Sequence, residues 1–181
     1  MSSPCSPDHA PVGDVGAALM YMDSQLKRIR TGSAAQDADD LLRQLIDSFD
    51  AQAANDMIDG TCTLIYLYMQ WLRQAHEAHD QDVVEHVVPY VVGTLKMMRR
   101  SIRPEGIPTM AGMLIAAAIG LSPTLWRKQY GPWTEAEMTA LEATAFLLAE
   151  HVNHLAGDDE TATRMIAEIL ATVAVDDGSL N

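Results

Sequence analysis

The sequence predicts an all-α fold, a single-domain bundle of seven to eight helices around a buried, Pro-kinked central helix. Two neighbouring apolar stripes run along residues 83–103 at alternating steps of four and three, which indicates a helix buried over most of its circumference. The first stripe consists of Val84, Val88, Val91, Leu95, Met98 and Ile102, and the second of Val83, Val87, Tyr90 and Met97. Helical patterns with short connections flank this stretch, and no segment has a convincing strand pattern.

Pro89 lies in the middle of the central stretch, within Val-Val-Pro-Tyr-Val-Val, which is β-branched enough to suit a buried strand. A central strand would lose a hydrogen bond at the proline, and the helical periodicity continues on both sides for longer than a strand extends. We therefore expect a helix that is kinked at Pro89. Gly93, one turn later, would let a neighbouring element approach closely.

The composition is that of a globular protein with one sizeable core. Of its 181 residues 48% are hydrophobic, and no linker rich in proline or glycine divides the chain. We expect a flexible tail at residues 1–12, one helical domain at 13–175 and a frayed C-terminus at 176–181.

The net charge of −13 limits the classes of partner, because nucleic acids and anionic membranes both attract basic surfaces. A helix-turn-helix over residues 145–167 would have a recognition helix that begins Asp-Asp-Glu and contains a single base, Arg164. Residues 132–181 hold ten acids and that one base. We expect no nucleic acid or membrane partner, and the C-terminal third forms an acidic pole.

The sequence indicates a cytoplasmic protein. Cys5 and Cys62 are too few for a disulfide framework and fit reduced thiols. The first residues, MSSPCSPDHAPVG, have neither a basic start nor an apolar run, so we expect no signal peptide. The apolar stretch at 110–121 is too short to cross a bilayer and lies between Pro108 and Pro123.

Three helices are expected before the central one. Their inward positions are Val15, Leu19, Met22, Leu26 and Ile29 in the first, Ala38, Leu42, Leu45 and Phe49 in the second, and Ile58, Cys62, Ile65, Met69 and Leu72 in the third. Gly32 would end the first helix, and Ser33 with Gln36 has the spacing of a capping box for the second. Asp82 caps the central helix in one reading, and Asp80 in another.

Four helical patterns follow the central one, over residues 110–121, 123–130, 134–156 and 158–173. Pro108 and Pro123 stand at the starts of the first two, where a proline costs no hydrogen bond. Thr134 with Glu137 has capping-box spacing at the start of the third, and Gly157 ends it.

No motif in the sequence supports catalysis, a metal or a cofactor. The densest set of possible ligands is His76, Glu77, His79, Asp80, Asp82, Glu85 and His86, but HEAH is one residue short of the zinc-protease pattern H-E-x-x-H. Glu150, His151 and His154 lack the Glu-x-x-His spacing of di-iron bundles. The acids at 37–47 stand near a helix start, where the dipole favours them. We expect no enzyme.

Bulky side chains are the candidate contacts with a partner or ligand: Trp126, Tyr130, Trp133, Trp71, Tyr90 and Met97. Methionines and aromatic residues at helical spacing more often belong to a core. Trp126, Tyr130 and Trp133 differ because they flank a Gly-Pro turn, so we expect these three to be exposed anchors.

Two functions remain open. The first is a non-enzymatic helical protein-interaction or regulatory module, and the alternative is a small-molecule-binding helical domain with a Met/aromatic cavity around the central helix. A basic partner would dock on the acidic surface formed by Glu135, Glu142, Asp159 and Glu168. We also expect a homodimer, because the third to fifth helices are more apolar than one layer of helices would cover.

Overall fold

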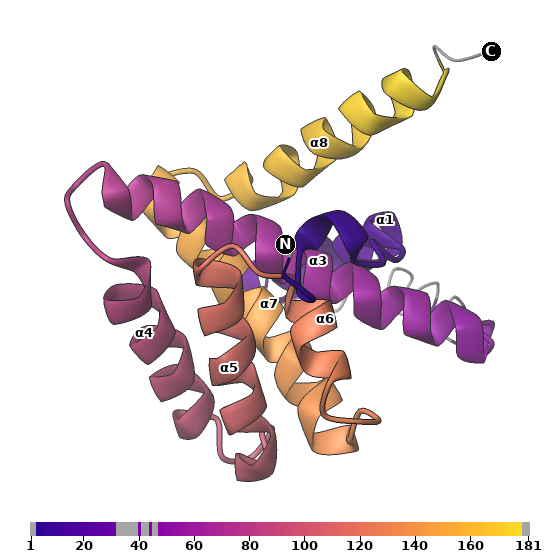
Figure 1. Cartoon of the computed structure of the whole chain (residues 1–181), viewed down its shortest axis with the longest axis horizontal. Coiled ribbons are helices and arrows are strands. Elements are labelled where there is room, and N and C mark those ends of the chain that lie inside the picture. The colour runs from indigo at the N-terminus through magenta and orange to yellow at the C-terminus, as the bar shows by residue number, and fades with distance from the viewer. Residues whose placement is uncertain (1–2, 32–39, 41–43, 45–46, 179–181) are drawn as a thin grey trace.

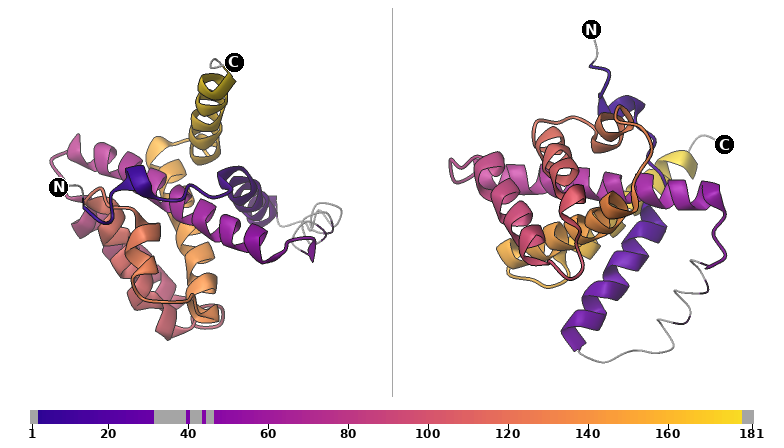
Figure 2. Two further views of the ribbon diagram at one scale, coloured as in Figure 1. Left: turned by 45° about the vertical axis from the view of Figure 1, so that its right-hand side comes forward. Right: turned by 90° about the horizontal axis from the view of Figure 1, so that it is seen from below.

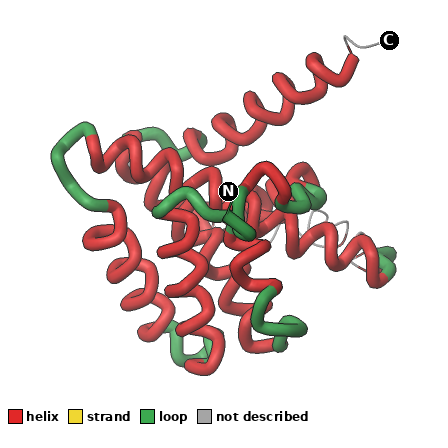
Figure 3. The backbone as a smooth tube through the Cα atoms, in the orientation of Figure 1, coloured by secondary structure: helices red, strands yellow, loops and turns green. Residues whose placement is uncertain are grey.

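The computed structural model describes residues 3–31, 40, 44 and 47–178 (Figure 1). Over these residues the chain forms seven α-helices and no strand, as the tube in Figure 3 shows. The elements are η1 (Pro7–His9), α1 (Val15–Thr31), α3 (Ala51–Glu77), α4 (Val83–Met97), η2 (Pro104–Gly106), α5 (Ile107–Ala118), α6 (Pro123–Lys128), α7 (Glu135–Ala156) and α8 (Thr161–Gly178). The predicted all-α fold is confirmed. The second predicted helix falls largely outside the described residues.

Side-chain caps fix where the helices begin. Asp82 Oδ1 accepts a hydrogen bond from the backbone N–H of Val84 at 2.8 Å, so Asp82 and not Asp80 caps α4. The capping box of Thr134 and Glu137 is present at the start of α7, and Gly157 ends that helix in the left-handed conformation, with φ of 66°. The sequence located these three caps correctly, whereas α4 ends at Met97 and not near residue 103, where the apolar stripes end.

The longest helix, α3, lies across one end of α4, α5 and α7 and organises the bundle (Figure 1). It packs against α1 on one side and against α5, α6 and α7 on the other. Its side chains Tyr68 and Leu72 are fully buried together with Leu95, Met110 and Met113, so the space between α3, α4 and α5 is filled. Other apolar side chains of α4 and α5 stay exposed, among them Met97 and Ile119, so the predicted homodimer stays a prediction.

The outer face of α4 is more exposed than the two stripes predicted. Tyr90 is 46% exposed and Met97 75% exposed, because α4 stands at the edge of the bundle beside α5 (Figure 1). The helix continues through Pro89, which lies on this exposed side. Gly93 was expected to admit a close neighbour, but a Cβ at this position would meet no atom within 4 Å.

The start of α1 crosses α3 at Gly60. A Cβ at Gly60 would collide with the carbonyl of Asp14, whose own N–H donates to Asp56 O at 2.8 Å. Glycine is thus required here by a close backbone approach. Across the described residues, no helix combines the length and hydrophobicity that crossing a lipid bilayer requires.

Candidate functional site

An open apolar groove, here called the α1–α7 groove, consists of two adjoining lobes of about 350 Å³ each. The first lobe is lined by Ala18, Tyr21, Met22, Phe49, Ala54, Met57, Ile58, Thr61, Met138, Leu141 and Glu142. The second is lined by Tyr21, Met22, Gln25, Arg28, Ile29, Met98, Ser101, Ile102, Thr139, Glu142, Ala143 and Phe146. The three residues that the lobes share, Tyr21, Met22 and Glu142, stand at their junction.

A single polar bridge marks that junction. The Tyr21 hydroxyl donates to Glu142 Oε1 at 2.6 Å, across from α1 to α7. Burial raises the pKa of Tyr21, and the neighbouring Glu142 carboxylate raises it further, so the hydroxyl keeps its proton. The bridge therefore holds α1 against α7. The first lobe is otherwise mostly apolar, whereas the second also has the polar side chains of Gln25, Arg28, Ser101 and Thr139.

Methionines give the groove an adaptable surface. Met57, Met98 and Met138 are partly exposed in the lobes, and Phe49 and Phe146 are half-buried beside them. The flexible thioether side chain of methionine adjusts its shape to different apolar partners at low cost. The groove can therefore bind apolar side chains, and its chemistry is that of a binding surface.

The predicted anchors lie elsewhere, around α6. Tyr130 is 65% exposed, whereas Trp126 and Trp133 are half-buried. Trp126 packs so closely on Gly112 that a Cβ there would collide with its ring. The Tyr130 ring lies tilted against Trp126, with ring centres 5.0 Å apart. Trp71 is half-buried at the margin of the core. None of the six candidate residues lines the groove.

The predicted acidic surface is divided by the fold. Glu135 pairs with Arg103 at 3.5 Å, and Glu142 belongs to the groove. Asp159 and Glu168 are exposed on the turn before α8 and on α8 itself. The four carboxylates are therefore spread over both ends of α7 and along α8.

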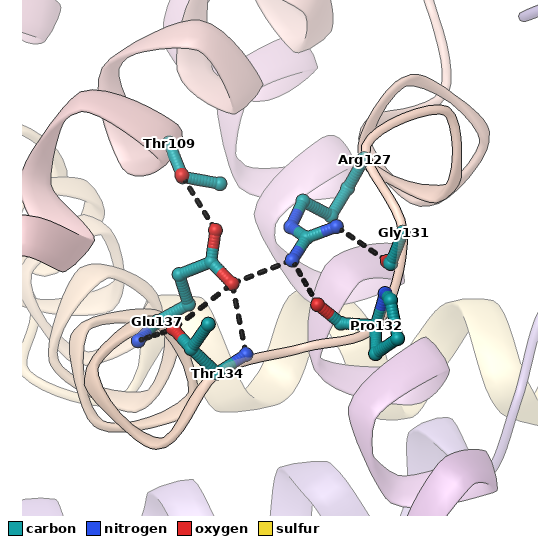
Figure 4. Close-up of polar contacts among 6 residues, drawn as sticks. All are labelled: Thr109, Arg127, Gly131, Pro132, Thr134 and Glu137. Carbon is teal, nitrogen blue, oxygen red and sulfur yellow. Dashed lines mark hydrogen bonds and ion pairs between the residues drawn. The ribbon is translucent and has the colours of Figure 1, made fainter.

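A buried ion pair joins α6 to α7 (Figure 4). Arg127, only 2% exposed, donates to Glu137 Oε2 at 2.5 Å and to the carbonyls of Gly131 and Pro132 at 2.8 Å each. Its guanidinium also lies over the ring of Trp133, 4.7 Å from the centroid. The pair thereby fixes the loop between the two helices.

Glu137 accepts several hydrogen bonds in this cluster, whereas Nε of Arg127 is buried without a partner among the described residues. It accepts from the Thr109 hydroxyl at 2.7 Å and from the Thr134 backbone N–H at 2.9 Å (Figure 4). Burial alone would raise its pKa, but the hydrogen bonds from Arg127, Thr134 and Thr109 outweigh burial and lower the pKa to about 2. With so low a pKa, the carboxylate stays charged at neutral pH. We assign the cluster to stability.

Three histidines stack where α3, α4 and α7 meet. The His76 ring lies between His86, at a centroid distance of 5.7 Å, and His151, at 6.2 Å, and both ring pairs are nearly parallel. His76 Nδ1 is 3.1 Å from Gln81 Oε1, while its buried Nε2 has no hydrogen-bond partner among the described residues. Parallel stacked rings do not direct their nitrogens at one point, and no described group of three His, Cys, Asp or Glu side chains could hold a metal ion.

The C-terminal helix α8 leaves the body after two turns (Figures 1 and 2). Its start is anchored, since Ala162 and Ile166 are fully buried and the Ala162 N–H donates to Asn153 Oδ1 at 2.7 Å. Beyond Ile166 its side chains are partly or fully exposed as far as residue 175. An exposed helix of this kind is a second candidate interaction surface.

No protein-family model, curated protein or solved structure matches the chain.

Proposed function

We propose that this protein is a non-enzymatic interaction module that binds an amphipathic, basic helix of a partner protein in the α1–α7 groove. The observation that carries the proposal is the lining of the groove, in which partly exposed methionines and phenylalanines surround one satisfied polar bridge. Amphipathic helices dock with their apolar face in grooves of this composition.

The shape of the groove favours a helix over a small molecule. Small ligands are held in pockets that cover roughly 70–90% of their surface. Among the residues that the structure describes, both lobes open toward solvent, and they adjoin, so apolar side chains from one helix could enter each of them. The alternative, a small apolar ligand, would leave much of its surface in water and is an outcome that the experiment below distinguishes.

The net charge of the protein favours a basic partner. With a net charge of −13, the chain repels acidic proteins and attracts basic ones over long range. The groove itself has one carboxylate, Glu142 at the junction of the lobes, and one base, Arg28 in the second lobe, so the attraction comes from the net charge of the whole chain. Lysine or arginine residues flanking the apolar face of the partner would therefore speed association.

The test uses a designed amphipathic peptide of leucine and lysine at helical spacing, with a fluorophore for anisotropy titration. Met138, 40% exposed in the first lobe, is changed to Lys, and the matched control is Ile115→Lys on α5, where Ile115 is 42% exposed and lines neither lobe. Both variants carry the same added charge. We expect Met138→Lys to weaken binding at least tenfold and Ile115→Lys to change it less than about twofold.

A second peptide, with glutamate in place of lysine, tests the sign of the charge. We expect it to bind more weakly than the lysine peptide, and the difference to shrink as salt screens the charges. No binding of the lysine peptide, or equal loss in both variants, would overturn the proposal. Saturable binding of a small apolar dye that the peptide cannot displace would instead favour the alternative.

A further inference from the structure

The histidine stack joins three helices through rings that take up protons near neutral pH. His76 of α3 lies between His86 of α4 and His151 of α7, and the Tyr90 ring of α4 lies tilted against His151 with centroids 4.9 Å apart. An unperturbed histidine changes its charge at about pH 6.5. The stack therefore places three protonatable rings where α4 packs against α3 and α7.

The central ring, His76, has no hydrogen-bond acceptor for a second N–H. Its Nδ1 is 3.1 Å from Gln81 Oε1, an oxygen that can only accept, so Nδ1 carries the proton of the neutral ring. Nε2 is buried and has no partner among the described residues. A proton on Nε2 would therefore be a buried, unpaired donor, and its charge would lie between two other protonatable rings. Adding protons to the stack costs free energy as long as the rings stay packed.

The carboxylates on the neighbouring turns do not pair with these rings. Glu77 of α3 pairs with Arg73 at 2.8 Å, and Glu150 of α7 pairs with Arg30 of α1 at 2.9 Å. The α5 helix, which also packs against α4, has no titratable side chain. Among the described residues no Asp or Glu forms an ion pair with a ring of the stack. The other titratable side chains of the adjacent turns are exposed: His79, Asp80, Asp82, Glu85 and His154.

We propose that the stack is a pH-sensitive latch, which mild acidification opens by releasing the first half of α4, residues 83–88, from α3 and α7. The two halves of α4 are joined by one hydrogen bond fewer than in a regular helix, because Pro89 has no N–H to donate to the Glu85 carbonyl. The first half can therefore move while the second half stays packed through the fully buried Val91 and Leu95.

An open cleft leaves the start of α4 with few neighbours on its other side. The cleft has a volume of about 580 Å³, and Val83 and Val84 of α4 line it together with Ala118 and Ile119 at the end of α5. The first half of α4 is consequently held mainly by the stack and by its buried valines. Release would expose Val87, which is fully buried in the packed form.

Acidification opens the latch because the released rings bind more protons than the packed rings. Burial, and then His76 and His154, lower the pKa of His151 below its ordinary 6.5, so a released ring takes up its proton at a higher pH than the packed one. Each proton that only the released state binds shifts the equilibrium about tenfold toward release for every pH unit below about 6.5. Two such rings would raise the released population by up to about 100-fold between pH 7.5 and 5.5.

The latch is independent of the docking proposed for the α1–α7 groove, because no ring of the stack lines either lobe. A latch that opens in a protein that does not bind the lysine peptide, or a protein that binds the peptide without a latch, would separate the two proposals.

The test is hydrogen exchange of the full chain, followed by mass spectrometry at pH 7.5 and 5.5. Protection factors remove the intrinsic pH dependence of amide exchange and report local opening. We expect the protection of residues 83–92 to fall at least about tenfold at the lower pH, and that of α1 to fall less than about threefold. Glu137 does not contribute, because its carboxyl stays charged at pH 5.5 in the folded protein.

Two variants and a matched control assign the effect to the stack. His151→Gln removes one protonatable ring, and His76→Phe keeps a ring but removes both nitrogens. Both should reduce the ratio of the two protection factors by at least about threefold. His154→Gln, one turn further along α7 and outside the stack, should leave the ratio nearly unchanged. Because the ratio is taken within each variant, a loss of packing at both pH values does not imitate this result.

Three results would overturn the latch. The first is a wild-type ratio below about threefold for residues 83–92. The second is an equal fall in α1, which would show that the whole fold opens. The third is a ratio that stays at its wild-type value in both His151→Gln and His76→Phe.

Discussion

The cluster around Arg127 and the surfaces of α1 and α8 differ in how far their side chains find partners within the chain. Around Arg127, the chain provides partners for a buried ion pair from three helices and a loop. Along α1 and α8, it leaves methionines, isoleucines and valines in water. Most polar groups of the Arg127 cluster have hydrogen-bond partners within the chain, so this cluster should govern stability. The exposed apolar side chains of α1 and α8 contribute less to stability and should govern binding. Mutations in the two regions should therefore separate the two properties.

The largest effect on stability is expected at the ion pair. Arg127→Ala should lower the free energy of unfolding by about 3–5 kcal/mol, because it leaves the Glu137 carboxylate buried without its partner. Met138→Ala in the groove should cost about 1 kcal/mol or less, since the side chain is 40% exposed. Denaturant unfolding of both variants makes this comparison. Equal losses would show that the groove is part of the core.

The dependence of stability on pH should come from two places, Glu137 at low pH and the histidine stack at higher pH. The pKa of Glu137 is about 2 in the folded protein against an ordinary 4.5, so the unfolded chain binds its proton first as the pH falls. Its contribution, roughly 3 kcal/mol, is present above pH 4.5 and lost between 4.5 and 2. Glu137→Gln should remove this acid-induced loss.

The histidine stack acts at higher pH. Burial, and then the nearby His76 and His154, lower the pKa of His151 below its ordinary 6.5. The unfolded chain therefore takes up this proton at a pH where the folded protein does not, and stability falls as the pH drops below 6.5. His151→Gln should flatten the stability profile between pH 7 and 5. A profile that is unchanged in this variant would contradict the assignment.

Substitutions of Gly60 and Gly93 should change stability by smaller amounts and in opposite directions. Gly60→Ala should destabilise the fold by about 2 kcal/mol, because the added methyl group collides with the Asp14 carbonyl. Gly93→Ala, where no atom lies within 4 Å, should stabilise the fold by roughly 0.5–1 kcal/mol through helix propensity. Thermal unfolding of the two variants would measure both signs, and a loss at both positions would show that Gly93 has a neighbour.

The smallest effect on binding of the lysine peptide is expected at the acidic pole. Asp159 and Glu168 lie away from the groove, so Asp159→Lys with Glu168→Lys should weaken the lysine peptide by less than about threefold at low salt. The loss should vanish at high salt. A loss as large as that of Met138→Lys would move the docking site to α8.

Sequence patterns were most informative where a structural feature is local. The caps at Asp82 and Thr134 and the stop at Gly157 involve neighbours within four residues, and all three are present. The periodicity also marked Met22 and Met98 as apolar helix positions. It could not show that they meet in an open groove, because whether another helix covers an apolar face depends on packing between distant segments.

Packing between distant segments also explains the other differences between the predictions and the structure. Tyr90 and Met97 belong to an apolar stripe, but α4 lies at the edge of the bundle and exposes them. Arg127 is buried against Glu137, ten residues further along the chain. A charge ten residues from its partner carries no periodic signal, so this pairing required the folded chain.

The central claim is that the α1–α7 groove is the docking site, and methionine methyl NMR tests it most directly. With the chain labelled at its methionine methyl groups, the lysine peptide should shift the signals of Met22, Met57, Met98 and Met138, which line the lobes. The signal of Met97, which is 75% exposed outside the groove, should stay in place. Shifts at Met97 without shifts in the lobes would contradict the account.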